Sequence, residues 1–92
     1  MTKRVKLKVK GRVQGVFYRQ STQDQARSLG LSGWVANQED GSVLVDAQGE
    51  KTKLESLINW CWNGPARANV SQVDVEWLDE TDPEISGFQI RR

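Results

Sequence analysis

The stretch from residue 4 to residue 19, RVKLKVKGRVQGVFYR, decides the fold, because within it a strand pattern gives way to a loop with two glycines. The apolar positions of the alternating part are Val5, Leu7 and Val9. Strict alternation with lysines between them predicts a half-buried strand over residues 4–12. Gly11 and Gly15 permit a tight loop in which main-chain N–H groups come together. Residues 20–29 then have the spacing of a short helix.

The rest of the chain predicts five further elements. They are strands at residues 33–37, 42–47, 72–77 and 88–90, and a helix at residues 50–63. Asp40-Gly41 is a strong hairpin signal between the second and third strands. Two helices that each follow a strand predict an α+β fold, a βαββαβ sandwich formed by residues 1–92 as a single domain. We expect one antiparallel sheet of order 4-1-3-2, a short fifth edge strand, and both helices on one face.

Composition excludes several classes of protein. Hydrophobic residues make up 37 % of the 92 residues and charged residues 27 %, which is ordinary for a soluble globular domain. The formal net charge of +1 provides no large field to recruit nucleic acid or a membrane surface. The single cysteine, Cys61, cannot form an intramolecular disulfide, and no run approaches the ~20 apolar residues of a membrane span. We therefore expect a cytoplasmic protein.

The absence of histidine restricts the chemistry further. It excludes Ser-His and Cys-His nucleophiles, imidazole acid–base catalysis and the commonest zinc sites. We expect no metal among the site residues.

The predicted topology brings two polar side chains to one edge of the sheet. In the order 4-1-3-2 the first and second strands run parallel, so Arg19, after the first strand, and Asn37, at the end of the second, should meet. A helix that begins beside the loop attracts anions through its free N–H groups and its dipole, and a guanidinium adds a bidentate cation. The loop is neither a Walker A motif nor a dinucleotide fingerprint. Taken alone, this pattern is also compatible with a tight turn that carries a surface arginine.

At this point the sequence resembles a known family. Residues 11–19, GRVQGVFYR, and residues 33–37, GWVAN, followed by Asp40-Gly41, resemble the two signatures of the acylphosphatases. The similarity covers the whole chain, because length, element order and Gly64-Pro65 after the second helix also fit. It implies a ferredoxin-like fold, hydrolysis of a carboxylic–phosphoric anhydride to a carboxylate and inorganic phosphate, and no cofactor.

The resemblance also assigns roles by position. Arg19 matches the family's phosphate-binding arginine, and Asn37 matches its water-orienting asparagine. The main-chain amides that match the phosphate loop are those of Gln14, Gly15, Val16, Phe17 and Tyr18. Tyr18 and Ala36 depart from the family pattern, which commonly has phenylalanine and arginine there. Neither departure removes a catalytic group. The Tyr18 hydroxyl is expected at the solvent-accessible edge of the core or near the site.

The chemistry of the reaction is consistent with these residues. A carboxylate leaving group, whose conjugate acid has a pKa of about 4, departs without a general acid. Phosphoryl transfer consists mostly of positioning and charge stabilisation, so a cationic cradle and one amide that aligns water suffice. Asn37 is no base at neutral pH, so the proton of the water is expected to pass to the phosphate.

Other conspicuous residues have structural interpretations. The lysines at residues 6, 8 and 10 suggest nucleic acid, but we expect cross-strand pairing with Asp46, Asp74 and Glu76. The four tryptophans are expected to fill the core, and Cys61 lies on the buried face of its helix. Arg12 is expected to be solvated or ion-paired, and the acidic residues between 79 and 84 to form a solvated loop.

Two alternatives to an enzyme remain at this stage. Ferredoxin-like sheets also form non-catalytic modules that bind RNA or a protein partner, but residues 42–46 lack the aromatics of an RNA-recognition motif. The other alternative is a member of the acylphosphatase family that has lost catalytic activity and only senses phosphate or a partner protein. The presence of both Arg19 and Asn37 argues against it. We therefore expect a monomeric acylphosphatase whose partner is a small acyl phosphate, with no nucleic acid or membrane.

Overall fold

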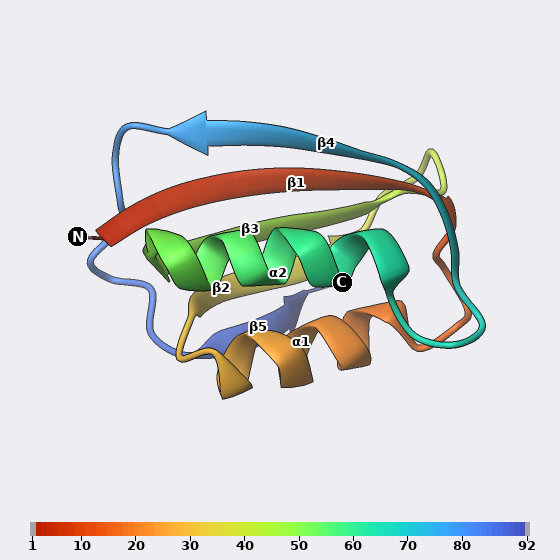
Figure 1. The fold of residues 1–92 in the computed structure, drawn as a ribbon, viewed down its shortest axis with the longest axis horizontal. Helices are drawn as coiled ribbons and strands as arrows, with labels where there is room; N and C mark the ends of the chain where they lie inside the picture. Colours follow the sequence, from red (N-terminus) through yellow and green to blue (C-terminus); the bar gives the residue numbers. More distant parts are fainter. Residues whose placement is uncertain (1, 92) are drawn as a thin grey trace.

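Five strands and two helices form the structure, a computed structural model that describes residues 2–91. The strands are β1 (Thr2–Arg12), β2 (Ser32–Asn37), β3 (Val43–Glu50), β4 (Asn69–Leu78) and β5 (Phe88–Arg91). The helices are α1 (Tyr18–Ser28) and α2 (Lys51–Asn63). Both helices lie on the same face of one sheet, so the fold is a two-layer ferredoxin-like sandwich, as predicted (Figure 1).

The sheet has the order β4-β1-β3-β2-β5, which confirms both the predicted 4-1-3-2 core and the short fifth edge strand. One part of the prediction is wrong: β5 pairs with β2 in parallel, so the sheet is mixed rather than wholly antiparallel. The reason is geometric. β4 ends at the end of the sheet where β2 begins, so the chain crosses that end and β5 starts beside the start of β2 (Figure 1).

The alternating pattern of β1 determines its orientation. Val5, Leu7 and Val9 are fully buried beneath the helices, whereas the lysines between them point to the open face. α1 begins at Tyr18, two residues earlier than predicted, because the Ser21 N–H already donates to the Phe17 carbonyl. The helices contribute their own buried stripes to the same core, formed by Tyr18, Thr22 and Ala26 on α1 and by Leu54, Leu57 and Cys61 on α2.

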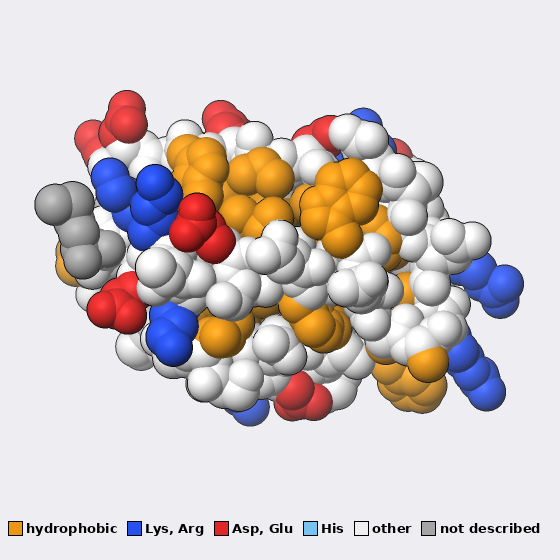
Figure 2. All heavy atoms as spheres, viewed as in Figure 1, with side chains coloured by type: hydrophobic (Ala, Val, Ile, Leu, Met, Phe, Trp, Pro, Cys, Tyr) orange, Lys and Arg blue, Asp and Glu red, His pale blue; other side chains and the backbone are white. Residues whose placement is uncertain are grey.

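The tryptophans do not fill this core, contrary to the prediction. Trp62 and Trp77 are 46 % and 43 % exposed, and Trp34 and Trp60 are only partly buried. β4 is an edge strand, so the apolar face that carries Trp77 extends beyond the helical layer (Figure 1). Apolar side chains accordingly reach the surface on the face that the helices cover (Figure 2).

Ion pairs occupy the basic side of β1. Lys10 pairs with Asp74 across β1 and β4 at 3.0 Å, which is the predicted cross-strand arrangement. Asp46, however, accepts two hydrogen bonds of 2.8 Å from the Arg4 guanidinium rather than pairing with a lysine. Lys8 pairs at 2.8 Å with Asp40 in the turn between β2 and β3, and this contact lowers the pKa of that carboxyl. No helix within residues 2–91 has the length and apolar character needed to cross a membrane.

Candidate active site

The loop between β1 and α1 is a concave turn with free N–H donors. Gly15 and Phe17 both have left-handed backbone conformations, with φ of 74° and 63°. Left-handed residues in a turn direct successive N–H groups to one side, which makes an anion-binding concavity. Within the described residues, none of the main-chain N–H groups from 14 to 20 donates a hydrogen bond. The first turn of α1 adds the positive end of its dipole to this concavity.

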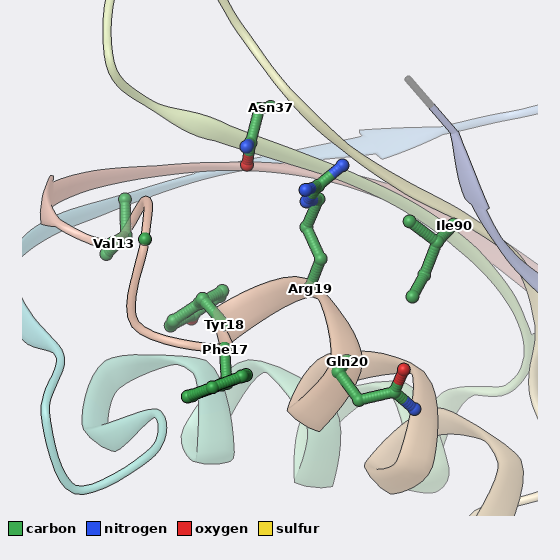
Figure 3. A pocket seen from close by; sticks show the side chains of 8 residues that line it. Val13, Phe17, Tyr18, Arg19, Gln20, Asn37 and Ile90 are labelled. Atoms are coloured by element: carbon green, nitrogen blue, oxygen red, sulfur yellow. The ribbon is translucent and has the colours of Figure 1, made fainter.

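Arg19 and Asn37 line one pocket beside this loop (Figure 3). Its volume is about 390 Å³, and the other lining residues are Val13, Gly15, Phe17, Tyr18, Gln20 and Ile90. Arg19 extends from the first turn of α1 toward Asn37, the last residue of β2 (Figure 3). The two side chains therefore meet at the sheet edge where the topology predicted them.

The position of Asn37 follows from strand register. β1 and β2 both pair antiparallel with β3, so they run parallel and end at the same edge. Val35 is fully buried on the helix side, and alternation places Asn37 on that side as well. Ala36 points to the opposite face and does not line the pocket.

Both polar side chains have unused hydrogen-bonding capacity. Among residues 2–91, Arg19 takes part in no ion pair, and no acidic residue lines its pocket. The Oδ1 atom of Asn37 is buried without a hydrogen-bond partner in the same part of the chain. A buried acceptor without a partner costs free energy, and such atoms are rare unless water or a ligand satisfies them. Within the described chain, the pocket thus contains an unpaired cation, and it is also lined by Asn37, a carboxamide whose buried oxygen lacks a partner.

The side chain of Gln14 connects the loop to the segment that follows Asn37. Its Nε2 group donates to the carbonyl oxygens of Gln38 at 2.8 Å and of Ser42 at 2.9 Å. The sequence predicts a role only for the main chain of Gln14, so this side-chain contact was not expected. The signal is absent from the sequence, because the contact depends on how the loop and the 38–42 turn lie relative to each other.

Tyr18 fills the core beneath the loop. Its hydroxyl donates at 2.7 Å to the carbonyl of Cys61, which the helix cannot satisfy because the residue four positions later, Pro65, has no N–H. Burial raises the pKa of Tyr18 well above its ordinary value, so the hydroxyl remains a donor. Burial also raises the pKa of Cys61 to about 12, which keeps this thiol unreactive. The Tyr18 hydroxyl therefore belongs to the core and not to the site.

We expect Tyr18→Phe to lower the free energy of unfolding by about 1–3 kcal/mol, because the buried Cys61 carbonyl then loses its donor. Urea unfolding followed by tryptophan fluorescence measures this change. An unchanged midpoint and slope would show that the carbonyl is satisfied without the hydroxyl.

Arg12, in contrast to Arg19, is exposed and lies outside the pocket. Among the described residues there is no group of three His, Cys, Asp or Glu side chains placed to hold a metal ion. The protein is thus a ferredoxin-like α+β sandwich, and an edge pocket that combines free N–H groups with an unpaired guanidinium has the chemistry of an anion site.

Comparison with known proteins identifies the particular family. The family model described as acylphosphatase matches residues 5–90. An acylphosphatase of Pelotomaculum thermopropionicum is 50 % identical over 82 residues, which cover 89 % of this chain and 88 % of the relative. The crystal structure of acylphosphatase from Bacillus subtilis is 32 % identical, with a TM-score of 0.93 and complete coverage of both chains. An acylphosphatase structure from Coxiella burnetii is 38 % identical, with a TM-score of 0.91 over 98 % of this chain and 93 % of that one.

The chain belongs to the acylphosphatase family and is an enzyme of that family. This membership confirms the resemblance on which the sequence-based assignment rested.

Proposed function

We propose that the protein hydrolyses the carboxyl–phosphate bond of small acyl phosphates without a metal, with residues 14–19 binding the phosphate and Asn37 orienting the water. The observation that carries this proposal is that Arg19 and Asn37 line the same pocket, beside unpaired main-chain N–H groups. Family membership supports the reaction, and the pocket supports the individual roles.

The proposed phosphate site uses two kinds of donor. The Arg19 guanidinium presents a planar fork that matches two phosphate oxygens, and the N–H groups of residues 14–18 surround the remaining charge. Charge that develops on the equatorial oxygens in the transition state is thereby stabilised by groups already in place. Substrate binding and rate acceleration then depend on the same loop.

The proposed role of Asn37 is to hold the attacking water. Its carboxamide, which lines the pocket, would hydrogen-bond to that water and direct the oxygen lone pair at phosphorus. As the new phosphorus–oxygen bond forms, the bond from phosphorus to the acyl oxygen breaks, and the carboxylate leaves with the electron pair. The proton of the water passes to the phosphate. No general acid is needed, because the conjugate acid of the leaving group has a pKa of about 4.

A colorimetric assay with benzoyl phosphate, with and without EDTA, tests this proposal. We expect rapid hydrolysis at the same rate in both conditions. Acetyl, carbamoyl and glyceroyl phosphates assayed side by side would reveal the preferred acyl group. Purified protein inert toward every acyl phosphate would contradict the proposed reaction, and a rate abolished by EDTA would contradict its metal independence.

We also propose that the protein acts as a cytoplasmic monomer formed by residues 1–92 as one domain. Both proposed site residues come from one chain, which supports function without a second subunit. On the open sheet face, the two central strands β1 and β3 carry Lys6 and Lys8 beside Leu44 and Asp46 rather than aromatics that could stack bases, which supports the absence of a nucleic-acid partner.

The hydrogen bonds of Gln14 predict a positioning role for its side chain. We expect Gln14→Leu to lower kcat/KM for benzoyl phosphate roughly tenfold to a hundredfold, because a shift of about 1 Å between the loop and Asn37 disturbs the reacting geometry. Steady-state kinetics measure this effect, and Gln72→Leu on the exposed edge strand is the matched control. Wild-type kinetics for Gln14→Leu would show that the two segments hold their positions without this link.

A further inference from the structure

Three of the four exposed large apolar side chains among the described residues belong to α2 and the edge strand β4. They are Trp62 on α2 and Val75 and Trp77 on β4. Figure 2 shows a row of apolar side chains on the face where Figure 1 places α2 and β4. Extended apolar surface on a soluble protein commonly marks a site of interaction with another molecule. The surface between α2 and β4 is therefore a candidate interaction site.

A groove follows this surface. The residues that line it are Glu55, Ile58, Asn59, Val75 and Trp77. Its volume is about 480 Å³, which is ample for side chains of a bound segment. Trp62 lies one helical turn beyond Ile58 on the same side of α2, so it extends the apolar lining. The groove shares no lining residue with the pocket of Arg19 and Asn37.

β4 has a free edge beside this groove. It is the first strand in the order β4-β1-β3-β2-β5, so β1 pairs with one edge and the other edge faces outward (Figure 1). Within residues 2–91, no main-chain hydrogen bond joins this outer edge to another segment. An edge strand of ten residues presents a row of N–H and C=O groups to which an extended segment can add.

The two faces of β4 determine which side chains such a segment needs. On the helix side its neighbours are Val75 and Trp77, so apolar residues fit there. On the open side its neighbours are Asp74 and Glu76, which are both exposed, so basic residues fit there. Glu76 takes part in no ion pair in the part of the chain that the structure describes. Glu55 adds a further negative charge inside the groove.

β1 already shows this complementarity on the inner edge of β4. Lys6 lies opposite Glu76 in the antiparallel pairing. Lys8 likewise lies opposite Asp74. The residues of β1 that alternate with these lysines are apolar and face the helices. A segment with the same alternation would repeat these contacts on the outer edge.

We propose that the outer edge of β4 and the adjoining groove bind an extended segment of a partner protein in which basic and apolar residues alternate. The segment adds to the sheet as a sixth strand through main-chain hydrogen bonds. A second copy of this chain is a poorer occupant. Two β4 strands paired antiparallel about Val75 would place Asp74 of each copy opposite Glu76 of the other, and like charges in that position repel. The inference does not depend on the proposed reaction, because the groove lies outside the pocket.

The test uses a synthetic peptide with the sequence of residues 4–10, RVKLKVK, capped at both ends. Its counterpart has glutamate in place of each lysine. We expect RVKLKVK to bind wild type at least about tenfold more tightly than the glutamate peptide in fluorescence anisotropy, and its affinity to fall as salt is added. Equal affinity for the two peptides, or no binding of RVKLKVK, would overturn the proposal.

Three variants locate the binding site. Glu76→Lys reverses a charge beside the added strand, so it should weaken RVKLKVK about threefold to tenfold and strengthen the glutamate peptide. Trp77→Ala should weaken RVKLKVK at least about fivefold, because buried tryptophans dominate many interfaces. Asp24→Lys makes the same change of charge on an exposed position of α1 and is the matched control, so it should alter neither affinity. All three should fold by circular dichroism and hydrolyse benzoyl phosphate as wild type does. Equal losses in Glu76→Lys and Asp24→Lys would overturn the site.

Hydrogen exchange of main-chain amides, followed by NMR, tests the addition of a strand. We expect RVKLKVK to slow exchange at alternate amides of β4, those that face outward. Binding without new protection in β4 would overturn strand addition. Sedimentation of wild type alone tests the other occupant: self-association that Trp77→Ala abolishes would assign the groove to a second copy and overturn the proposal.

Discussion

Arg19→Ala is expected to lower kcat/KM for benzoyl phosphate by at least about 10³-fold, because it removes a cation and a bidentate donor from the transition state. No other cation lines the pocket among the described residues, so no neighbour replaces the lost charge. Steady-state hydrolysis of benzoyl phosphate, with circular dichroism to verify folding, measures the loss. Arg19 is only partly buried and forms no ion pair there, so the variant should fold normally.

Two variants control this experiment. Arg12→Ala removes the same side chain from an exposed position outside the pocket and should retain activity. Arg19→Lys keeps the charge but not the planar fork, so we expect an intermediate rate. Equal losses in Arg12→Ala and Arg19→Ala would indicate a general effect of charge rather than a site.

For Asn37→Ala we expect a fall in kcat of roughly 10²–10³-fold with little change in KM. The side chain is assigned to the attacking water and not to the phosphate, so its loss should affect turnover more than substrate binding. The measurement is a full substrate-dependence curve with benzoyl phosphate. A raised KM with unchanged kcat would contradict the assignment, because it would place Asn37 in ground-state binding.

Asn59→Ala is the control for this variant, since Asn59 is an exposed residue of α2 outside the pocket. Asn37→Asp gives a sharper comparison. It retains an acceptor for the water but adds a negative charge beside the phosphate, so we expect a loss at least as large as that of the alanine variant. Wild-type activity in Asn37→Asp would show that the pocket holds no anion close to this residue.

Much of the fold is predictable because strand and helix patterns are local. Val5, Leu7 and Val9 alternate in the sequence and are fully buried in the structure. Leu54, Leu57 and Cys61 have helical spacing and form the buried face of α2. The order of the first four strands is the usual one for a fold with this sequence of elements. The same rules bring Arg19 and Asn37 to one edge.

What the sequence did not predict depends on contacts between distant segments. The direction of β5 depends on where β4 ends in space, and the exposure of Trp77 depends on how far the helical layer extends over the sheet. The Gln14 link depends on the position of the 38–42 turn relative to the loop. The left-handed Phe17 is the clearest case, because its residue type disfavours the conformation that the loop imposes. Local pattern contains none of this information.

Isothermal titration calorimetry with inorganic phosphate tests the separate roles of the two side chains most directly. The proteins to compare are wild type, Arg19→Ala and Asn37→Ala. Wild type and Asn37→Ala should bind phosphate with similar affinity, and Arg19→Ala should show no measurable binding. Strong binding of phosphate by Arg19→Ala would contradict the proposal that Arg19 binds the phosphate. Loss of phosphate binding in Asn37→Ala alone would contradict the proposal that Asn37 holds only the water.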